Sequence, residues 1–160
     1  MIEIQSLIYN FNEHGLYYDY VSSNSQNRKL ITLSIDTIQL EIDYDTKEIL
    51  MITGFIPLIN AGTISINEQK YDEQKFLVPV KNIEYSEGIS YDYCDIFPES
   101  SNYFLKNEVV MTFYDKINKV ILIGTTEAAD KHIRVNKNII CGLDEKGNLQ
   151  YLQITPDIVI

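Results

Sequence analysis

Residues 30–43 read LITLSIDTIQLEID, and this stretch decides the fold. Apolar and polar side chains alternate on both sides of a short break at Asp36-Thr37. Alternation with a period of two is what a β-strand needs when one face is buried and the other is wet. The stretch therefore predicts two strands, Leu30–Ile35 and Ile38–Asp43, joined by a tight turn into an antiparallel hairpin.

The same chemistry recurs in three segments, each made of a strand, an Asp-led turn and a strand. These segments are residues 39–55, 108–124 and 138–154. The Asp side chain can accept hydrogen bonds from backbone N–H groups two residues on, and Gly147 or Asn118 tolerates a positive φ. The separations between the segments are uneven, so we interpret them as recurring hairpins and not as a true repeat.

The overall pattern predicts a mainly β fold made of roughly ten short strands. We expect an antiparallel β-sandwich, or a strongly twisted antiparallel sheet built from hairpins, with one or two short helices. The better helix candidate is residues 126–132, and residues 100–107 could form a helical turn. Gly88 and Pro98 favour a loop over continuous sheet between residues 82 and 105. At 160 residues, the chain is expected to form a single domain, 1–160.

The charge of the chain is strongly negative and unevenly spread. There are 13 basic and 23 acidic residues, a net charge of −10, all of it carried by residues 1–105. Such a field repels nucleic acid and anionic lipid and attracts basic proteins or cations. The alternative is that the negative charge only keeps the protein soluble. The absence of a signal peptide pattern and of a long apolar run predicts a cytoplasmic protein without membrane contact, whose Cys94 and Cys141 stay reduced.

Residues 82–105 read NIEYSEGISYDYCDIFPESSNYFL and contain no Lys or Arg. Tyrosine supplies large contact area at protein interfaces, and carboxylates beside it steer a basic partner. We predict that this stretch binds a partner protein through Glu84, Tyr85, Glu87, Tyr91, Asp92, Tyr93, Asp95 and Glu99. The alternative is that the tyrosines are ordinary strand residues and the acids form a solvated face. A smaller candidate of the same kind is residues 17–20, Tyr-Tyr-Asp-Tyr.

No catalytic motif is found in the sequence. A nucleophile needs a positioned base, but His14 lies in an expected turn and His132 near the end of the expected helix, where a surface role is favoured. Asp43, Asp45 and Glu48 are spaced like calcium ligands, yet they lack the glycine and terminal Glu of an EF-hand loop, so a hairpin turn is preferred. We therefore expect no enzymatic activity, no metal and no cofactor.

Residues 31–58, ITLSIDTIQLEIDYDTKEILMITGFIPL, contain two strands around an Asp-x-Asp-Thr turn and end in Gly-aromatic-x-Pro. This passage is similar to small bacterial immunity proteins of polymorphic or contact-dependent growth inhibition toxin systems. It covers under a fifth of the chain and carries over no functional residue. The resemblance implies a cytosolic antitoxin that binds and neutralises the C-terminal effector domain of a cognate toxin, often a basic nuclease, in a one-to-one complex.

Three hypotheses remain open at this point. The first is an immunity protein that blocks a toxin active site through its acidic, Tyr-rich surface. The second is an acidic nucleic-acid mimic or regulator of a basic host protein, which would bind many nucleic-acid-binding proteins with a steep salt dependence. The third is a carboxylate-dependent hydrolase, which requires a concave pocket with convergent, pKa-shifted acids.

Overall fold

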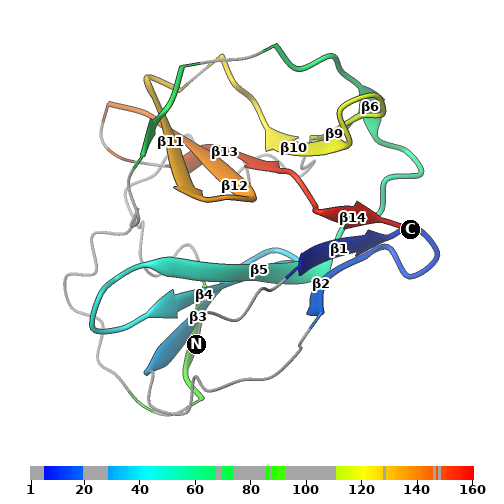
Figure 1. Ribbon diagram of the computed structural model, residues 1–160. Coiled ribbons are helices and arrows are strands. Elements are labelled where there is room, and N and C mark those ends of the chain that lie inside the picture. Colours follow the sequence, from blue (N-terminus) through cyan, green and yellow to red (C-terminus); the bar gives the residue numbers. More distant parts are fainter. Residues whose placement is uncertain are drawn as a thin grey trace.

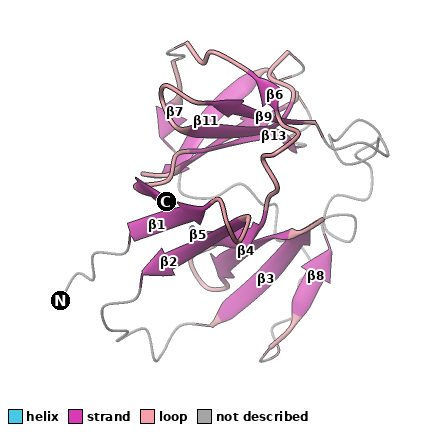
Figure 2. Ribbon diagram, turned by 90° about the vertical axis from the view of Figure 1, so that its right-hand side faces the viewer, coloured by secondary structure: helices cyan, strands magenta, loops and turns pink. Residues whose placement is uncertain are grey.

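The computed structural model describes residues 6–19, 29–67, 70–73, 86, 88–92, 111–127, 129–145, 147 and 149–160. These residues form two seven-stranded sheets that pack face to face (Figures 1 and 2). Both sheets are mixed, since most neighbouring strands are antiparallel and the short outermost strands are parallel to their neighbours. The predicted mainly β, sandwich-like architecture is confirmed.

The first sheet has the strand order β14-β1-β2-β5-β4-β3-β8. Its strands are β1 (Ser6–Asn10), β2 (Gly15–Asp19), β3 (Leu30–Ile35), β4 (Ile38–Asp43), β5 (Ile49–Phe55), β8 (Ser90–Asp92) and β14 (Ile158–Val159). The second sheet has the order β6-β9-β10-β13-β12-β11-β7. Its strands are β6 (Gly62–Thr63), β7 (Asp72–Glu73), β9 (Thr112–Asp115), β10 (Val120–Gly124), β11 (Lys131–Asn136), β12 (Ile139–Leu143) and β13 (Leu149–Ile154).

The two sheets share one plan. In each sheet five antiparallel strands follow the spatial order first, second, fifth, fourth, third, and a short parallel strand flanks each end. The flanking strands are partly exchanged, because β6 follows β5 in the chain but pairs with β9, while β14 follows β13 but pairs with β1. The segments at residues 39–55 and 138–154 therefore occupy corresponding places, as β4–β5 and β12–β13, whereas residues 112–124 form β9–β10, which corresponds to β1–β2. The two sheets share a strand order, and the interpretation of the three segments as recurring hairpins stays a prediction.

The core lies between the inner faces of the sheets, where both contribute β-branched and Leu side chains. The alternation of residues 30–43 sends Ile31, Leu33 and Ile35 inward, each no more than 1% exposed. From the second sheet Ile121, Ile139 and Ile154 are fully buried. Burying one such side chain stabilises the fold by about 1.5–3 kcal/mol, so this shared face holds the two sheets together.

Three hairpin turns use one side-chain device. Asn10, Asp43 and Asp115 each end a strand, and each accepts hydrogen bonds through Oδ1 from the backbone N–H groups two and three residues on, at 2.9–3.2 Å. The residue four positions on has a positive φ in every case: His14 (54°), Lys47 (64°) and Lys119 (57°). The predicted turn chemistry is confirmed at Asp43 and Asp115, and Gly147 has the predicted positive φ. In the turn after Asp115 it is Lys119 and not Asn118 that has a positive φ.

The helix expected at residues 126–132 is not formed. Thr126 and Ala129 take part in a single turn, closed by the Ala129 N–H donating to the Thr126 carbonyl at 3.3 Å, and β11 starts at Lys131. A short helix has a costly nucleus and gains little, whereas Ile133 and Val135 alternate inward along β11 and are buried in the core. The helical turn expected at residues 100–107 lies outside the described residues.

Candidate functional site

Strand β8 carries the described part of the predicted acidic site. It lies at the edge of the first sheet, parallel to β3, with Thr32, Leu33 and Ser34 opposite Ser90, Tyr91 and Asp92. A strand here corrects the expectation of a loop, because β3 offers a free ladder that Ser90–Asp92 can complete despite the glycine at 88. The Oγ atoms of Ser34 and Ser90 lie 3.2 Å apart, which places both side chains on one face.

The strand separates two predicted interface residues onto opposite faces. Tyr91 is opposite Leu33 and packs against the hydrophobic core, partly buried. Asp92 is exposed and lies on the outer face with Ser90. The other predicted interface residues lie outside the described residues, namely Glu84, Tyr85, Glu87, Tyr93, Asp95 and Glu99. Partner binding by this set stays a prediction; among its described members Tyr91 packs against the core and Asp92 is exposed.

The outer face next to Asp92 is polar and carries no base on three neighbouring strands. Two neighbouring rows of side chains face outward across β8, β3 and β4. The first row is Ser90, Thr32 and Glu41, and the second is Asp92, Ser34 and Gln39. Thr32 donates its hydroxyl to Glu41, with Oγ1 2.9 Å from Oε1. Burial raises the pKa of Glu41, and the Thr32 hydroxyl partly offsets this by lowering it. The face can therefore accept hydrogen bonds and positive charge.

The carboxylates weighed as calcium ligands form a hairpin turn. Asp43 is buried and its Oδ1 accepts from the backbone N–H groups of Asp45 and Thr46 at 2.9 and 3.0 Å. The preference for a hairpin over an EF-hand-like loop is confirmed. Within the described ranges no group of three or more His, Cys, Asp or Glu side chains is arranged to hold a metal ion.

Of the two histidines, only His14 lies where the sequence predicts it, in the β1–β2 turn. His14 packs edge-on against Phe55, with ring centroids 5.8 Å apart, and its Nδ1 is buried without a hydrogen-bond partner. His132 is not at a helix end; it lies on β11, where its Nδ1 and the Tyr151 hydroxyl are 2.5 Å apart. Cys141 is a buried free thiol whose pKa is raised by burial, as expected of a small reduced hydrophobe, while Cys94 lies outside the described residues.

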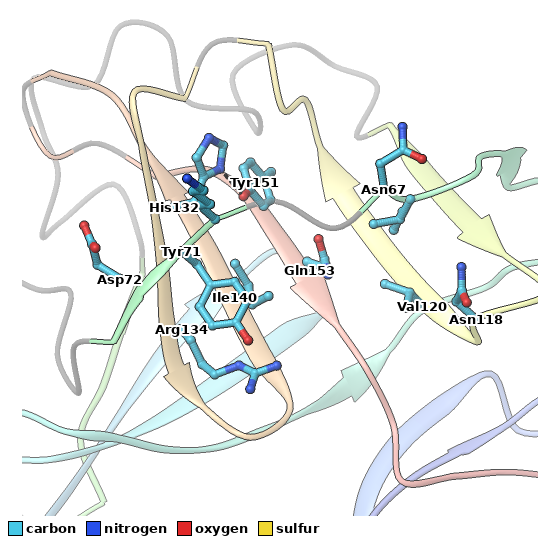
Figure 3. A pocket seen from close by; sticks show the side chains of 12 residues that line it. Asn67, Tyr71, Asp72, Asn118, Val120, His132, Arg134, Ile140, Tyr151 and Gln153 are labelled. Carbon is cyan, nitrogen blue, oxygen red and sulfur yellow. Dashed lines mark hydrogen bonds between the residues drawn. The ribbon is translucent and has the colours of Figure 1, made fainter.

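A second feature is a hollow of about 760 Å³ over the outer face of the second sheet (Figure 3). Its described lining comes from β10–β13, from the β9–β10 turn and from the segment between β6 and β7 with the start of β7. It consists of Ile66, Asn67, Lys70, Tyr71, Asp72, Asn118, Val120, His132, Arg134, Ile140, Tyr151 and Gln153. Sequence reasoning missed this site. The alternation of Lys131–Asn136 was its one available signal, because it sends His132 and Arg134 to the same outer face.

Tight local contacts shape this hollow. Tyr151 lies across Gly142, where an added Cβ would be 2.0 Å from the tyrosine ring, so only glycine lets the hydroxyl reach His132. Burial raises the pKa of Tyr151 to about 12. The guanidinium of Arg134 stacks on Tyr71, with Cζ 4.5 Å from the ring centroid. In Figure 3 His132 and Arg134 of β11, Tyr151 of β13 and Tyr71, which precedes β7, lie over the same face of the sheet.

One wall of the hollow is fixed by Asp115. Its Oδ2 accepts from the Ile66 N–H at 2.9 Å and from Asn118 Nδ2 at 2.8 Å, and its Oδ1 accepts from the N–H groups of Ile117 and Asn118. These donors, the Ile66 and Asn118 N–H groups first, lower the pKa of Asp115 to about 2. The carboxylate thereby ties the β9–β10 turn to the segment after β6.

Two comparisons of the chain with known proteins, one with models of protein families and one with the curated proteins, gave no match. A further structural finding concerns membranes: the part of the chain that is described has no helix of the length and apolarity that a bilayer crossing needs.

Proposed function

We propose that this protein is an immunity protein that binds and neutralises the effector domain of a cognate bacterial toxin. The observation that supports the proposal is the outer face of β8, β3 and β4, which presents Asp92 and Glu41 among hydroxyl and amide side chains without a Lys or Arg. It continues the acidic stretch at residues 82–105, which contains no base.

Charge complementarity gives this face its expected partner. A basic surface, such as the active-site cleft of a nuclease, would be steered toward a chain of net charge −10 and would pair with carboxylates at close range. Binding there excludes the nucleic acid substrate because both compete for the same Lys and Arg side chains. The protein would act by occupancy in a one-to-one complex, without a reaction of its own.

The test is co-expression with the protein encoded next to it, with growth as one readout and co-purification in high salt as the other. We expect the neighbour alone to be toxic, and co-expression to restore growth and give a one-to-one complex. The triple variant Glu84→Lys, Glu87→Lys and Asp92→Lys should fold but lose protection.

A matched control separates local contact from net charge. Reversal of three exposed acids of the second half, Glu127→Lys, Asp130→Lys and Glu145→Lys, changes the net charge equally. This control should keep protection. Equal loss in both triple variants would show that only the overall charge matters, and a harmless neighbour would overturn the proposal.

A further inference from the structure

The hollow on the second sheet contains two cationic side chains without an anionic partner in the described structure. Arg134 makes its contact with the Tyr71 ring, and its Nε is buried without a hydrogen-bond acceptor. Lys70 is exposed at the rim. Asp72 is the single acid in the described lining and forms no ion pair with either base. Glu73 lies opposite Arg134 in the β7–β11 register and forms no ion pair with it, so the guanidinium has no carboxylate partner among the described residues.

A buried guanidinium N–H without an acceptor is an unsatisfied hydrogen-bond donor. The N–H groups of a guanidinium form a planar fork that matches the two oxygens of a carboxylate or phosphate, and stacking on an aromatic ring fixes its orientation in advance. An unpaired buried N–H costs free energy that an incoming oxyanion recovers. Tyr71, on which the guanidinium stacks, is 39% exposed, so the stacked pair lies at the surface and not inside the core.

The rest of the lining suits an organic body attached to that anion. The floor is formed by the buried side chains of Val120 and Tyr151 beside the half-buried Ile140. The amide groups of Asn67 and Gln153 stand around it and have no hydrogen-bond partner among the described residues. Apolar walls with a few polar groups are the usual composition of a small-molecule site.

We propose that this hollow binds a small organic anion, with a carboxylate or phosphate group at Arg134 and Lys70 and a flat apolar body over Tyr151 and Ile140. The volume of about 760 Å³ lies in the range of small-ligand pockets, roughly 300–1,000 Å³. The acidic field of the chain disfavours a long polyanion, since most phosphates of a nucleic acid would lie outside the pocket near repelling charge. The site is independent of the toxin-binding function proposed above.

The test is a titration of the ¹⁵N-labelled full chain with three probes of similar shape, followed by two-dimensional NMR at low salt. Benzoate carries a carboxylate, phenyl phosphate a phosphate, and benzamide neither charge. We expect benzoate, phenyl phosphate or both to shift amides of β11, β12 and β13, and benzamide to bind at least about tenfold more weakly, because a charged hydrogen bond is lost. Binding by one anion alone identifies which group the site takes.

Substitutions at the fork locate the anion. Arg134→Gln should weaken the better probe at least about tenfold, and Arg134→Lys, which keeps the charge but loses the fork, should fall between it and the original chain. Lys47→Gln, in the β4–β5 turn of the other sheet, removes the same charge and should leave affinity unchanged. Lys70→Gln, at the exposed rim, gives a second measurement in case Arg134→Gln disturbs the fold, and should weaken binding several-fold.

Four results would overturn the proposal. One is the absence of binding by both anions. Another is benzamide binding as tightly as benzoate. The third is an affinity that Arg134→Gln and Lys70→Gln leave unchanged. The fourth is a set of amide shifts that lie away from the second sheet.

Discussion

Corresponding register positions on the outer faces of the two sheets carry different side chains. In the first sheet one row across the third, fourth and fifth strands is Thr32, Glu41 and Met51. In the second sheet the same row is His132, Gly142 and Tyr151. Both rows contain a cross-strand hydrogen bond, but the first joins direct neighbours and the second passes over a glycine.

The difference extends to the neighbouring row and its charge. Ser34 and Gln39 of the first sheet correspond to Arg134 and Ile140 of the second. One plan thus supports an acidic, polar face beside β8 and a cation-bearing hollow beside β7. Strand order determines where side chains stand, while a single small residue and a few charges decide what the face can bind.

The largest expected effect on stability is that of a substitution at Gly142. Gly142→Ala would place a Cβ about 2.0 Å from the buried ring of Tyr151 and 2.9 Å from the Ala129 Cβ, so the ring must move. We expect the free energy of unfolding, measured by urea denaturation, to fall by about 2 kcal/mol. Glu41→Ala at the corresponding position of the first sheet should cost less than about 1 kcal/mol. Equal costs would show that the close passage of Tyr151 imposes no constraint.

The next effect is a difference in the pH dependence of stability between the corresponding turns at Asn10 and Asp115. The carboxylate of Asp115 has a folded pKa of about 2 against an ordinary value of 3.8, so it stabilises the fold fully above pH 3.8 and loses this contribution as the pH falls toward 2. Denaturation of the original chain and of Asp115→Asn at several pH values should show a stability difference that shrinks over that interval. Asn10→Ala, at a neutral turn residue, should show a constant difference.

A smaller effect concerns the hydroxyl of Tyr151. Tyr151→Phe keeps the ring and removes the hydrogen bond to His132, so the free energy of unfolding should fall by about 1 kcal/mol. In the Gly142→Ala background, where the ring has moved, the same change should cost much less. Additive costs in a double-mutant cycle would contradict the role assigned to the glycine.

The smallest expected effect is a change in the pKa of Glu41 on the outer face of the first sheet. Thr32→Val removes the hydroxyl that donates to Glu41, so the pKa of Glu41, already raised by burial, should rise further. An NMR titration of the Glu41 side-chain carboxyl measures it directly. Thr53→Val, on the same outer face but without a bond to Glu41, is the control and should leave the pKa unchanged.

Much of the fold could be predicted because strand pattern and turn chemistry are local. The alternation in residues 30–43 gives β3 and β4 with the predicted bounds, and the Asp-led turns at Asp43 and Asp115 form as expected. Strand β11 was not predicted, because a capping Thr and two alanines favour a helix before it. The alternation of Ile133 and Val135 indicates the strand that forms. Burial in the core outweighed helix propensity there.

The candidate sites could be predicted only in part. The acidic composition of residues 82–105 is visible in the sequence, but the turning of Tyr91 toward the core depends on the parallel register with β3. The hollow joins Tyr71 to Arg134 and His132 to Tyr151. No periodicity within a single segment encodes such pairs, because they come from strands that meet only after folding.

The sequence by itself determined the antiparallel strands other than β11, the inward and outward faces of β3 and β4, and the turns at Asp43 and Asp115, since each depends on neighbouring residues and on a two-residue period. The tertiary structure alone decided the exchange of β6 and β14 between the sheets, the position of β8 and the place of Gly142 beneath Tyr151. Those features depend on pairing over long sequence separations. The whole core sets that pairing by burying its apolar face, and no single segment specifies it.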